Sequence, residues 1–164
     1  MTRIRLETED DFEAVREVAI QAFGTTEEAE LLEGLRESGD LVLSLVAEDT
    51  DMVAGHIAFS RLWVVDGDSR HPAVALAPLA VAPDRTGRAV ATLLVREAHA
   101  CLAAMGESLS VVLGEPRFYA QFGYTHGRAA RFDSKYQSPY LQAVSFRNAP
   151  TAGALLYPEA FNRF

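Results

Sequence analysis

The sequence has few residues that could build covalent or metal cross-links. It contains one cysteine, Cys101, and four histidines among 164 residues. A single cysteine cannot form an intramolecular disulfide, and it excludes a zinc site built from several cysteines. His71, His99 and His126 do not show the spacing of a metal site. We therefore expect neither a disulfide framework nor a metal, and a cytoplasmic location.

Long apolar runs and an excess of basic residues are also missing. No stretch approaches the roughly 20 apolar residues that a membrane-spanning helix needs, and the start of the sequence lacks the apolar segment of a signal peptide. The 15 Lys and Arg residues face 23 Asp and Glu residues, for a formal net charge of -8. This balance argues against a protein that coats nucleic acid or an anionic membrane. Neither is expected as a partner.

What is present fits an ordinary globular protein. Apolar residues make up 49% and charged residues 23% of the sequence, close to the globular average, and we expect one domain over residues 1–164. The charge is uneven along the sequence: residues 1–70 contain 17 acidic and 6 basic residues, whereas residues 71–164 contain 6 acidic and 9 basic residues. An anionic ligand should therefore bind to the second half.

Periodicity and turn residues predict an α+β fold around a mixed sheet. The expected elements are a strand at 3–6, helices ending at about 23 and 39, a hairpin of strands 41–48 and 52–65, a buried strand at 73–82, a helix to about 105, a strand at 108–113, a short helix to 122 and a strand near 124. Strand-like pieces follow at 141–146 and 154–157. Pro78 lies inside the buried strand, and because proline cannot donate to a ladder, it predicts a local bulge or splay.

The turn between the buried strand and the long helix is suited to an anion. The first amides of a helix have no intrahelical partner, and the helix dipole adds partial positive charge, so backbone donors can hold a phosphate there. Arg85 and Arg88 lie in this turn and can add charge-assisted hydrogen bonds. An ordinary strand-to-helix turn with surface arginines is the alternative.

Two segments together carry a family resemblance. Leu76-Ala-Pro-Leu-Ala-Val-Ala-Pro leads into the turn, and Val112-Leu-Gly-Glu-Pro-Arg-Phe-Tyr-Ala-Gln-Phe-Gly-Tyr follows the next strand. With the tail Gly153-Ala-Leu-Leu-Tyr-Pro-Glu-Ala-Phe, they resemble the GCN5-related N-acetyltransferase (GNAT) superfamily, most of all its bacterial YhbS-like branch. The resemblance implies an α/β/α sandwich with a mixed, mostly antiparallel sheet and two central parallel strands that splay apart.

The resemblance also implies acetyl-CoA as the donor. Its pantetheine arm would pair with Leu79, Ala80 and Val81, and its pyrophosphate would bind the loop, where Arg85 adds charge. The family's loop pattern, Gln/Arg-x-x-Gly-x-Gly/Ala, falls on Thr86, Gly87, Arg88, Ala89, Val90 and Ala91, with Thr92 next to it. Thr86 and Ala89 depart from the pattern. If Ala89 needed a positive φ it would cost on the order of 1 kcal/mol, but in a first helical turn it would not.

The resemblance places a tyrosine, here Tyr119, as the acid for the departing thiolate; packing under the short helix is the alternative. Many relatives use a glutamate on the central strand as the base, but residues 76–81 contain no carboxylate. Glu28 and His56 are then the candidate bases, although each also fits a structural role. A base acting through water, or an amine of low pKa, would need neither.

The predicted function is therefore transfer of an acetyl group from acetyl-CoA to a primary amine of a small molecule or a peptide. The acid-rich first half is compatible with a cationic acceptor, and equally with a solvated acidic surface. The altered loop and the missing strand carboxylate leave a second possibility, an acyl-CoA-binding module without transferase activity. The sequence is compatible with a monomer or a homodimer.

Overall fold

The computed structural model describes residues 2–85 and 87–163. Its strands are β1 (Thr2–Leu6), β2 (Leu41–Asp49), β3 (Met52–Asp66), β4 (Ser69–Val81), β5 (Leu109–Leu113), β6 (Phe132–Asp133), β7 (Leu141–Ser145) and β8 (Gly153–Leu156). Its α-helices are α1 (Phe12–Phe23), α2 (Glu27–Ser38), α3 (Gly87–Ala104), α4 (Pro116–Tyr119) and α5 (His126–Ala129). Short 3-10 helices are η1 (Glu9–Asp11), η2 (Ala120–Phe122) and η3 (Glu159–Arg163). None of the helices in these ranges is both long and apolar enough to cross a membrane.

The strands form one mixed sheet in the order β1-β2-β3-β4-β5-β7. Neighbours along this path are antiparallel except β4 and β5, which run parallel from Val74 opposite Ser110 to Leu76 opposite Val112. Strand β8 pairs with the end of β3 and, in parallel, with β6. The mixed, mostly antiparallel sheet with central parallel strands is confirmed.

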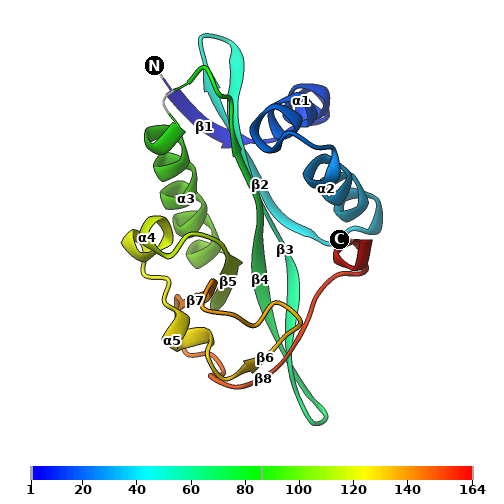
Figure 1. Ribbon diagram of the computed structural model, residues 1–164, viewed down its shortest axis with the longest axis vertical. Coiled ribbons are helices and arrows are strands. Elements are labelled where there is room, and N and C mark those ends of the chain that lie inside the picture. Colours follow the sequence, from blue (N-terminus) through cyan, green and yellow to red (C-terminus); the bar gives the residue numbers. More distant parts are fainter. Residues whose placement is uncertain (1, 86, 164) are drawn as a thin grey trace.

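Helices cover both faces of this sheet (Figure 1). Alternate residues of β4 point to opposite faces, so Ala73 and Ala75 pack with Leu35 of α2, whereas Val74 and Leu76 pack with Leu94 of α3. All four β4 residues are buried. An apolar strand with both faces covered is the arrangement that the continuous apolar run predicts.

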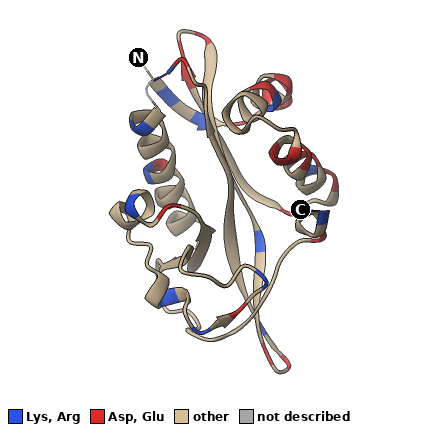
Figure 2. Cartoon of the chain, viewed as in Figure 1, with Lys and Arg blue, Asp and Glu red and all other residues tan. Residues whose placement is uncertain are grey.

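The helix ends follow the sequence signals. Gly39 and Gly106 stop α2 and α3 with φ of 75° and 90°, a left-handed conformation that costs glycine little. The acidic residues of α1 and α2 form the red patches in Figure 2, on the side of the sheet away from α3. The uneven charge of the sequence is thus also uneven in space.

The last quarter differs most from the prediction. The strand expected near Tyr124 is a single bridge between Thr125 and Ala143, because Thr125 instead caps α5 by accepting a hydrogen bond from the Arg128 amide. Tyr124 is buried among side chains, with its hydroxyl 2.8 Å from Ser110 Oγ. Helix α5, strand β6 and η3 were not predicted, whereas strands β7 and β8 lie where the sequence indicated.

Candidate functional site

The parallel strands β4 and β5 part after three paired residues. Their pairing stops at Leu76 and Val112, but β4 continues along β3 to Val81. The β3–β4 register shifts between Ile57 and Phe59, opposite the segment that holds Pro78. The bulge and splay predicted from Pro78 are confirmed. Leu79, Ala80 and Val81, the predicted pantetheine contacts, lie on this extension, with Ala80 buried and the other two half-buried.

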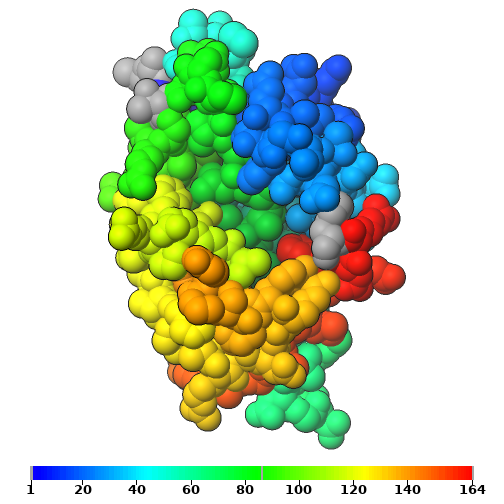
Figure 3. Space-filling view, in the orientation of Figure 1, coloured from blue at the N-terminus to red at the C-terminus, as the bar shows by residue number. Residues whose placement is uncertain are grey.

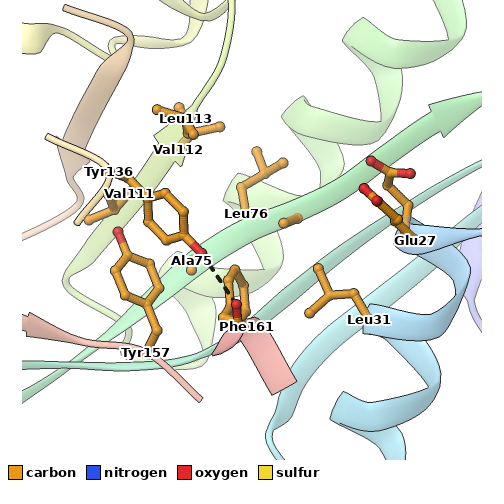
Figure 4. Close-up of a pocket in the computed structure, with 12 residues that line it drawn as sticks. Glu27, Leu31, Ala75, Leu76, Val111, Val112, Leu113, Tyr136, Tyr157 and Phe161 are labelled. Carbon is orange, nitrogen blue, oxygen red and sulfur yellow. Dashed lines mark hydrogen bonds between the residues drawn. The ribbon is translucent and has the colours of Figure 1, made fainter. Parts of the chain in front are cut away.

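A cavity of about 210 Å³ opens where the two strands part (Figure 4). Residues of both strands line the cavity, so the cavity reaches the gap between them. In Figure 3 the green of β4 is visible in a hollow between the blue helices and the yellow-green segment around α4. The cavity is lined by Glu27, Glu28, Leu31, Ala75, Leu76, Ala77, Val111, Val112, Leu113, Tyr136, Tyr157 and Phe161.

Three aromatic side chains from the last quarter form one wall of this cavity. The Tyr136 and Tyr157 rings meet edge to face with centroids 5.1 Å apart, and the Tyr157 and Phe161 centroids are 5.3 Å apart. The Tyr136 hydroxyl donates to the Phe161 carbonyl at 3.5 Å. Burial raises the pKa of Tyr157 to about 12, so its hydroxyl stays protonated. We call these three residues the aromatic wall.

Lys135, the only lysine in the sequence, holds this wall in place. Its Nζ atom donates to the Phe161 carbonyl at 3.4 Å and to Asn162 Oδ1 at 3.3 Å, and it lies 5.0 Å from the centroid of the Tyr136 ring. It therefore ties η3 to the segment that carries Tyr136. No local motif indicates this contact, because Phe161 and Asn162 lie 26 and 27 residues after Lys135 in the sequence.

Of the two candidate bases, the structure brings Glu28 to the cavity. Glu28 lies in the first turn of α2, is half-buried, and accepts a hydrogen bond from Thr25 Oγ1 at 3.3 Å. Its neighbour Glu27 also lines the cavity and is exposed. Two carboxylates thus lie at one end of an otherwise apolar space.

His56 lies in the core under α1 and α2 and is not among the described residues that line the cavity. Its side chain is 1% exposed, and its Nε2 atom lies 2.7 Å from Ser44 Oγ and 3.8 Å from Glu7 Oε2. Desolvation, with the nearby Arg36 guanidinium, lowers the pKa of His56 to about 3. The ring is therefore neutral at pH 7 and enclosed. This position supports a structural role for His56, which was the alternative to its role as a base.

Tyr119 lies on the other face of the sheet, next to the end of β5. Its ring packs edge to face on Phe118 and Tyr124, with centroids 4.9 and 5.6 Å away, and it is 8% exposed. Burial raises the pKa of Tyr119 to about 12. The ring fits only because residue 114 is glycine: a Cβ there would lie 2.6 Å from Tyr119 Cε2. Sequence reasoning did not identify this role of Gly114.

The predicted phosphate loop leads into α3, which begins at Gly87. Arg88, Ala89 and Thr92 line a shallow hollow together with Leu93 and Gln121. Ala89 is helical and is not among the residues with positive φ, so the steric cost considered above does not arise. Val90 and Ala91 are buried and can offer a ligand only their backbone. Thr86 lies outside the described residues.

The two arginines of the loop lie apart. Arg88 borders the hollow at the start of α3, whereas Arg85 Nη1 lies 3.3 Å from Asp49 Oδ2 at the end of β2. Arg85 borders a second hollow beside α1. Of the two arginines, therefore, only Arg88 borders the hollow at the start of α3. Within the described ranges, no group of three or more His, Cys, Asp or Glu side chains is arranged to hold a metal ion.

Comparison with known proteins agrees with this geometry. A family model described as "Acetyltransferase (GNAT) domain" matches residues 3–127. The chain is 35% identical over 169 residues to the N-acetyltransferase YhbS of Escherichia coli strain K12, covering 98% of this chain and 99% of the relative. It is also 35% identical over 133 residues to the N-acetyltransferase YjhQ of the same strain, covering 79% of this chain and 71% of that one.

Two solved structures extend the match to the whole fold. The crystal structure of YhbS from Escherichia coli in complex with CoA has a TM-score of 0.90 at 31% identity, covering 99% of this chain and 93% of that one. A GNAT family acetyltransferase from Brucella melitensis in complex with acetyl-CoA has a TM-score of 0.83 at 31% identity, covering 98% of both chains. The chain belongs to the GNAT family of N-acetyltransferases.

Proposed function

We propose that the protein transfers the acetyl group of acetyl-CoA to a primary amine by direct attack in a ternary complex. The observation that carries the proposal is the parting of β4 and β5 over a cavity that residues of both strands line. Two relatives at 31% identity were crystallised with CoA or acetyl-CoA, which supports the same donor here. The hollow of Arg88, Ala89 and Thr92 at the start of α3 is our candidate for the pyrophosphate site.

The extension of β4 is suited to the pantetheine arm. Between Ala77 and Val81, β4 pairs with β3 on one side, and no other described strand pairs with it on the side that β5 has left. Backbone groups of Leu79, Ala80 and Val81 on that side can hydrogen-bond the pantetheine amides as a neighbouring strand would. The backbone amide of Leu79 is also our candidate donor to the oxyanion that forms at the thioester carbon, because the Ala80 amide faces β3 in the β3–β4 register.

The reaction needs little activation of the donor. The amine nitrogen bonds to the thioester carbon, the carbon–sulfur bond breaks, and the amine proton leaves the new amide while the thiolate gains one. Glu28, which lines the cavity, is our candidate to accept the amine proton through a water molecule. The amine must first be neutral, which costs roughly 4.6 kcal/mol at pH 7 for an amine of pKa 10.4 and about 1 kcal/mol for an α-amine.

Tyr119 has the opposite task at the sulfur. A thiol has a pKa near 8.5, so complete proton transfer from a tyrosine of pKa about 12 would cost about 5 kcal/mol. We therefore assign Tyr119 as the hydrogen-bond donor that stabilises the departing thiolate, with the net proton supplied by the amine. Because its hydroxyl stays protonated well above pH 10, this role should persist across the neutral and alkaline range.

The Tyr119→Phe variant tests this assignment, because it removes the hydroxyl and keeps the ring. We expect kcat, measured as thiol release from acetyl-CoA with an amine, to fall about 100-fold. The dissociation constant of acetyl-CoA, measured by calorimetry, should change less than about threefold. In the wild type, kcat should not decline between pH 8 and pH 10 through Tyr119. Equal losses in kcat and in acetyl-CoA binding would contradict the assignment.

The acyl-CoA-binding module is the second candidate, favoured by the ion pair of Arg85 with Asp49 and by the lack of a carboxylate on residues 76–81. Tight binding of acetyl-CoA without thiol release on any amine would support it. Absence of binding would contradict both candidates. We further propose that residues 1–164 form a single domain that works as a monomer or homodimer. We also propose a cytoplasmic location, which is supported by a single free cysteine that needs no oxidising compartment.

A further inference from the structure

The cavity is small for the substrates that an acidic protein suggests. Its volume of about 210 Å³ lies below the roughly 300–1,000 Å³ of pockets that enclose drug-sized ligands. Part of that space must admit the acetyl group at the gap between β4 and β5. What remains suits one small group and not a branched polycation.

Most acidic residues of the first half lie outside the cavity, and several of them pair with arginines. Arg5 binds Asp11 and Glu48, Arg36 binds Glu7, and Arg16 binds Glu33. Only Glu27 and Glu28 among the acidic residues line the cavity. The net charge is therefore no argument for a polycationic acceptor.

Apart from these two carboxylates, every residue lining the cavity is aliphatic or aromatic. Glu27 and Leu31 extend from α2 on one side, and the aromatic wall lies on the other side, beyond β4 (Figure 4). An amine with a nonpolar body is complementary to this cavity, since its nitrogen can bind a carboxylate and its body can pack against the apolar side chains. A polar body would lose water and would find few hydrogen-bond partners beyond the hydroxyls of Tyr136 and Tyr157.

The aromatic wall is fixed rather than adaptable. Its rings contact one another at 5.1 and 5.3 Å, and Lys135 binds the backbone of Phe161. Phe161 is buried and Tyr157 is half-buried. Preordered rings bind a flat group with little loss of side-chain entropy, and their edges and faces favour another ring over a polar chain.

Resting on the proposed transferase function, we propose that the acceptor is a small primary amine with an apolar, ring-sized body, and that the aromatic wall of Tyr136, Tyr157 and Phe161 selects it. The amine lies at the Glu28 end, next to the gap between the strands, and the ring packs against the wall. Large polycations are disfavoured because they exceed the size of the cavity. Short polar amines are disfavoured because they bury little apolar surface and pay the free energy of removing their polar groups from water.

A panel of three amines tests the inference on the full chain: 2-phenylethylamine, ethanolamine and spermidine, each with acetyl-CoA and thiol release as the readout. We expect kcat/KM for 2-phenylethylamine to exceed that for ethanolamine by about 10- to 100-fold, as expected for burying one ring, and spermidine to be no better than ethanolamine. If ethanolamine or spermidine equals or exceeds 2-phenylethylamine, the inference is overturned.

Acetyl-CoA calorimetry separates this failure from failure of the proposed function. Binding with turnover of polar amines alone would leave the transferase intact and remove the aromatic acceptor. Absence of acetyl-CoA binding would remove the transferase itself. Binding without turnover on all three amines would also count against the inference, because its preferred substrate is in the panel.

Phe161→Ala then tests the wall directly. The preference for 2-phenylethylamine over ethanolamine should fall about tenfold, and Phe161→Leu, which keeps an apolar core residue, should lower it less and serves if the alanine variant does not fold. Phe23→Ala is the matched control, since Phe23 is exposed at the end of α1 and does not line the cavity. An unchanged preference in both Phe161 variants would contradict the role of the wall.

Discussion

Residues 3–127 and the residues after them contribute different halves of the site. The first stretch, which the family model matches, holds β4, β5, the start of α3, and Tyr119. The second holds Tyr136, Tyr157 and Phe161, which line the cavity on the side of the sheet away from α3. In the proposed function, the donor is therefore bound by regular elements. The acceptor is bound by the start of α2 on one side and by the aromatic wall, which lies on turns and a terminal 3-10 helix, on the other.

This division has a physical basis. Regular strands and helices fix backbone groups precisely enough to bind a thioester and a phosphate. The aromatic wall after residue 127 selects by shape, and it is held by contacts between its own rings and by hydrogen bonds from Lys135. Changes in the two stretches should therefore separate turnover, donor binding and acceptor binding.

The largest effect should come from Gly114→Ala, in the first stretch. The added Cβ would lie 2.6 Å from Tyr119 Cε2, so the ring must move, and a shift of about 1 Å at a reacting group can cost about 100-fold in kcat. Steady-state kinetics should show this loss with little change in acetyl-CoA affinity. Gly127→Ala is the control, because a Cβ there meets nothing within 4 Å. Equal kcat in both variants would show that Tyr119 tolerates displacement.

A smaller effect is expected in donor binding, where the two loop arginines should differ. Arg88→Ala should raise the dissociation constant of acetyl-CoA about tenfold, as loss of a charged contact does, since Arg88 borders the hollow at the start of α3. Arg85→Ala should raise it less than about threefold, because Arg85 pairs with Asp49. Calorimetry measures both. The reverse order would mean that Arg85 leaves Asp49 when the donor binds.

The smallest effect should come from Lys135→Met, in the second stretch. Loss of the contacts to Phe161 and Asn162 should loosen η3 and raise the KM of the amine about fivefold. Acetyl-CoA affinity should stay unchanged, which is the reverse of the Arg88→Ala result. Lys135→Arg, which can still donate to both oxygens, should restore most of the lost affinity for the amine. A Lys135→Met variant that weakens only the binding of acetyl-CoA would contradict the assignment of acceptor binding to the residues after 127.

Much of the donor side could be predicted from the sequence. Apolar periodicity, the glycine stops and Pro78 indicated the elements, the two-sided burial of β4 and its irregular pairing, because these depend on local spacing. The family resemblance added the positions of Tyr119 and the loop. The close approach of Gly114 to Tyr119 was not predicted, since a glycine after a strand usually serves a turn.

The acceptor side could not be predicted to the same degree. Tyr136 and Phe161 lie outside the predicted elements, and Tyr157 ends the strand-like piece predicted at 154–157. The meeting of these three residues depends on how their segments cross the end of the sheet, which local spacing does not reveal. Glu28 was expected near the acceptor and lines the cavity. His56, judged by residue type alone, was an equal candidate, and only its burial beneath α1 and α2 separates it from the cavity.

One edge of the β4 extension, on the side away from β3, pairs with no other described strand. This open edge has a further consequence for the protein without its donor. An open strand edge can pair with a strand of another chain and so promote aggregation. The extension ends at Val81, which keeps this open edge short. A bound pantetheine arm would occupy the same backbone groups. Acetyl-CoA should therefore act as a protectant against strand-mediated self-association as well as a substrate, and the protein should be handled with it present.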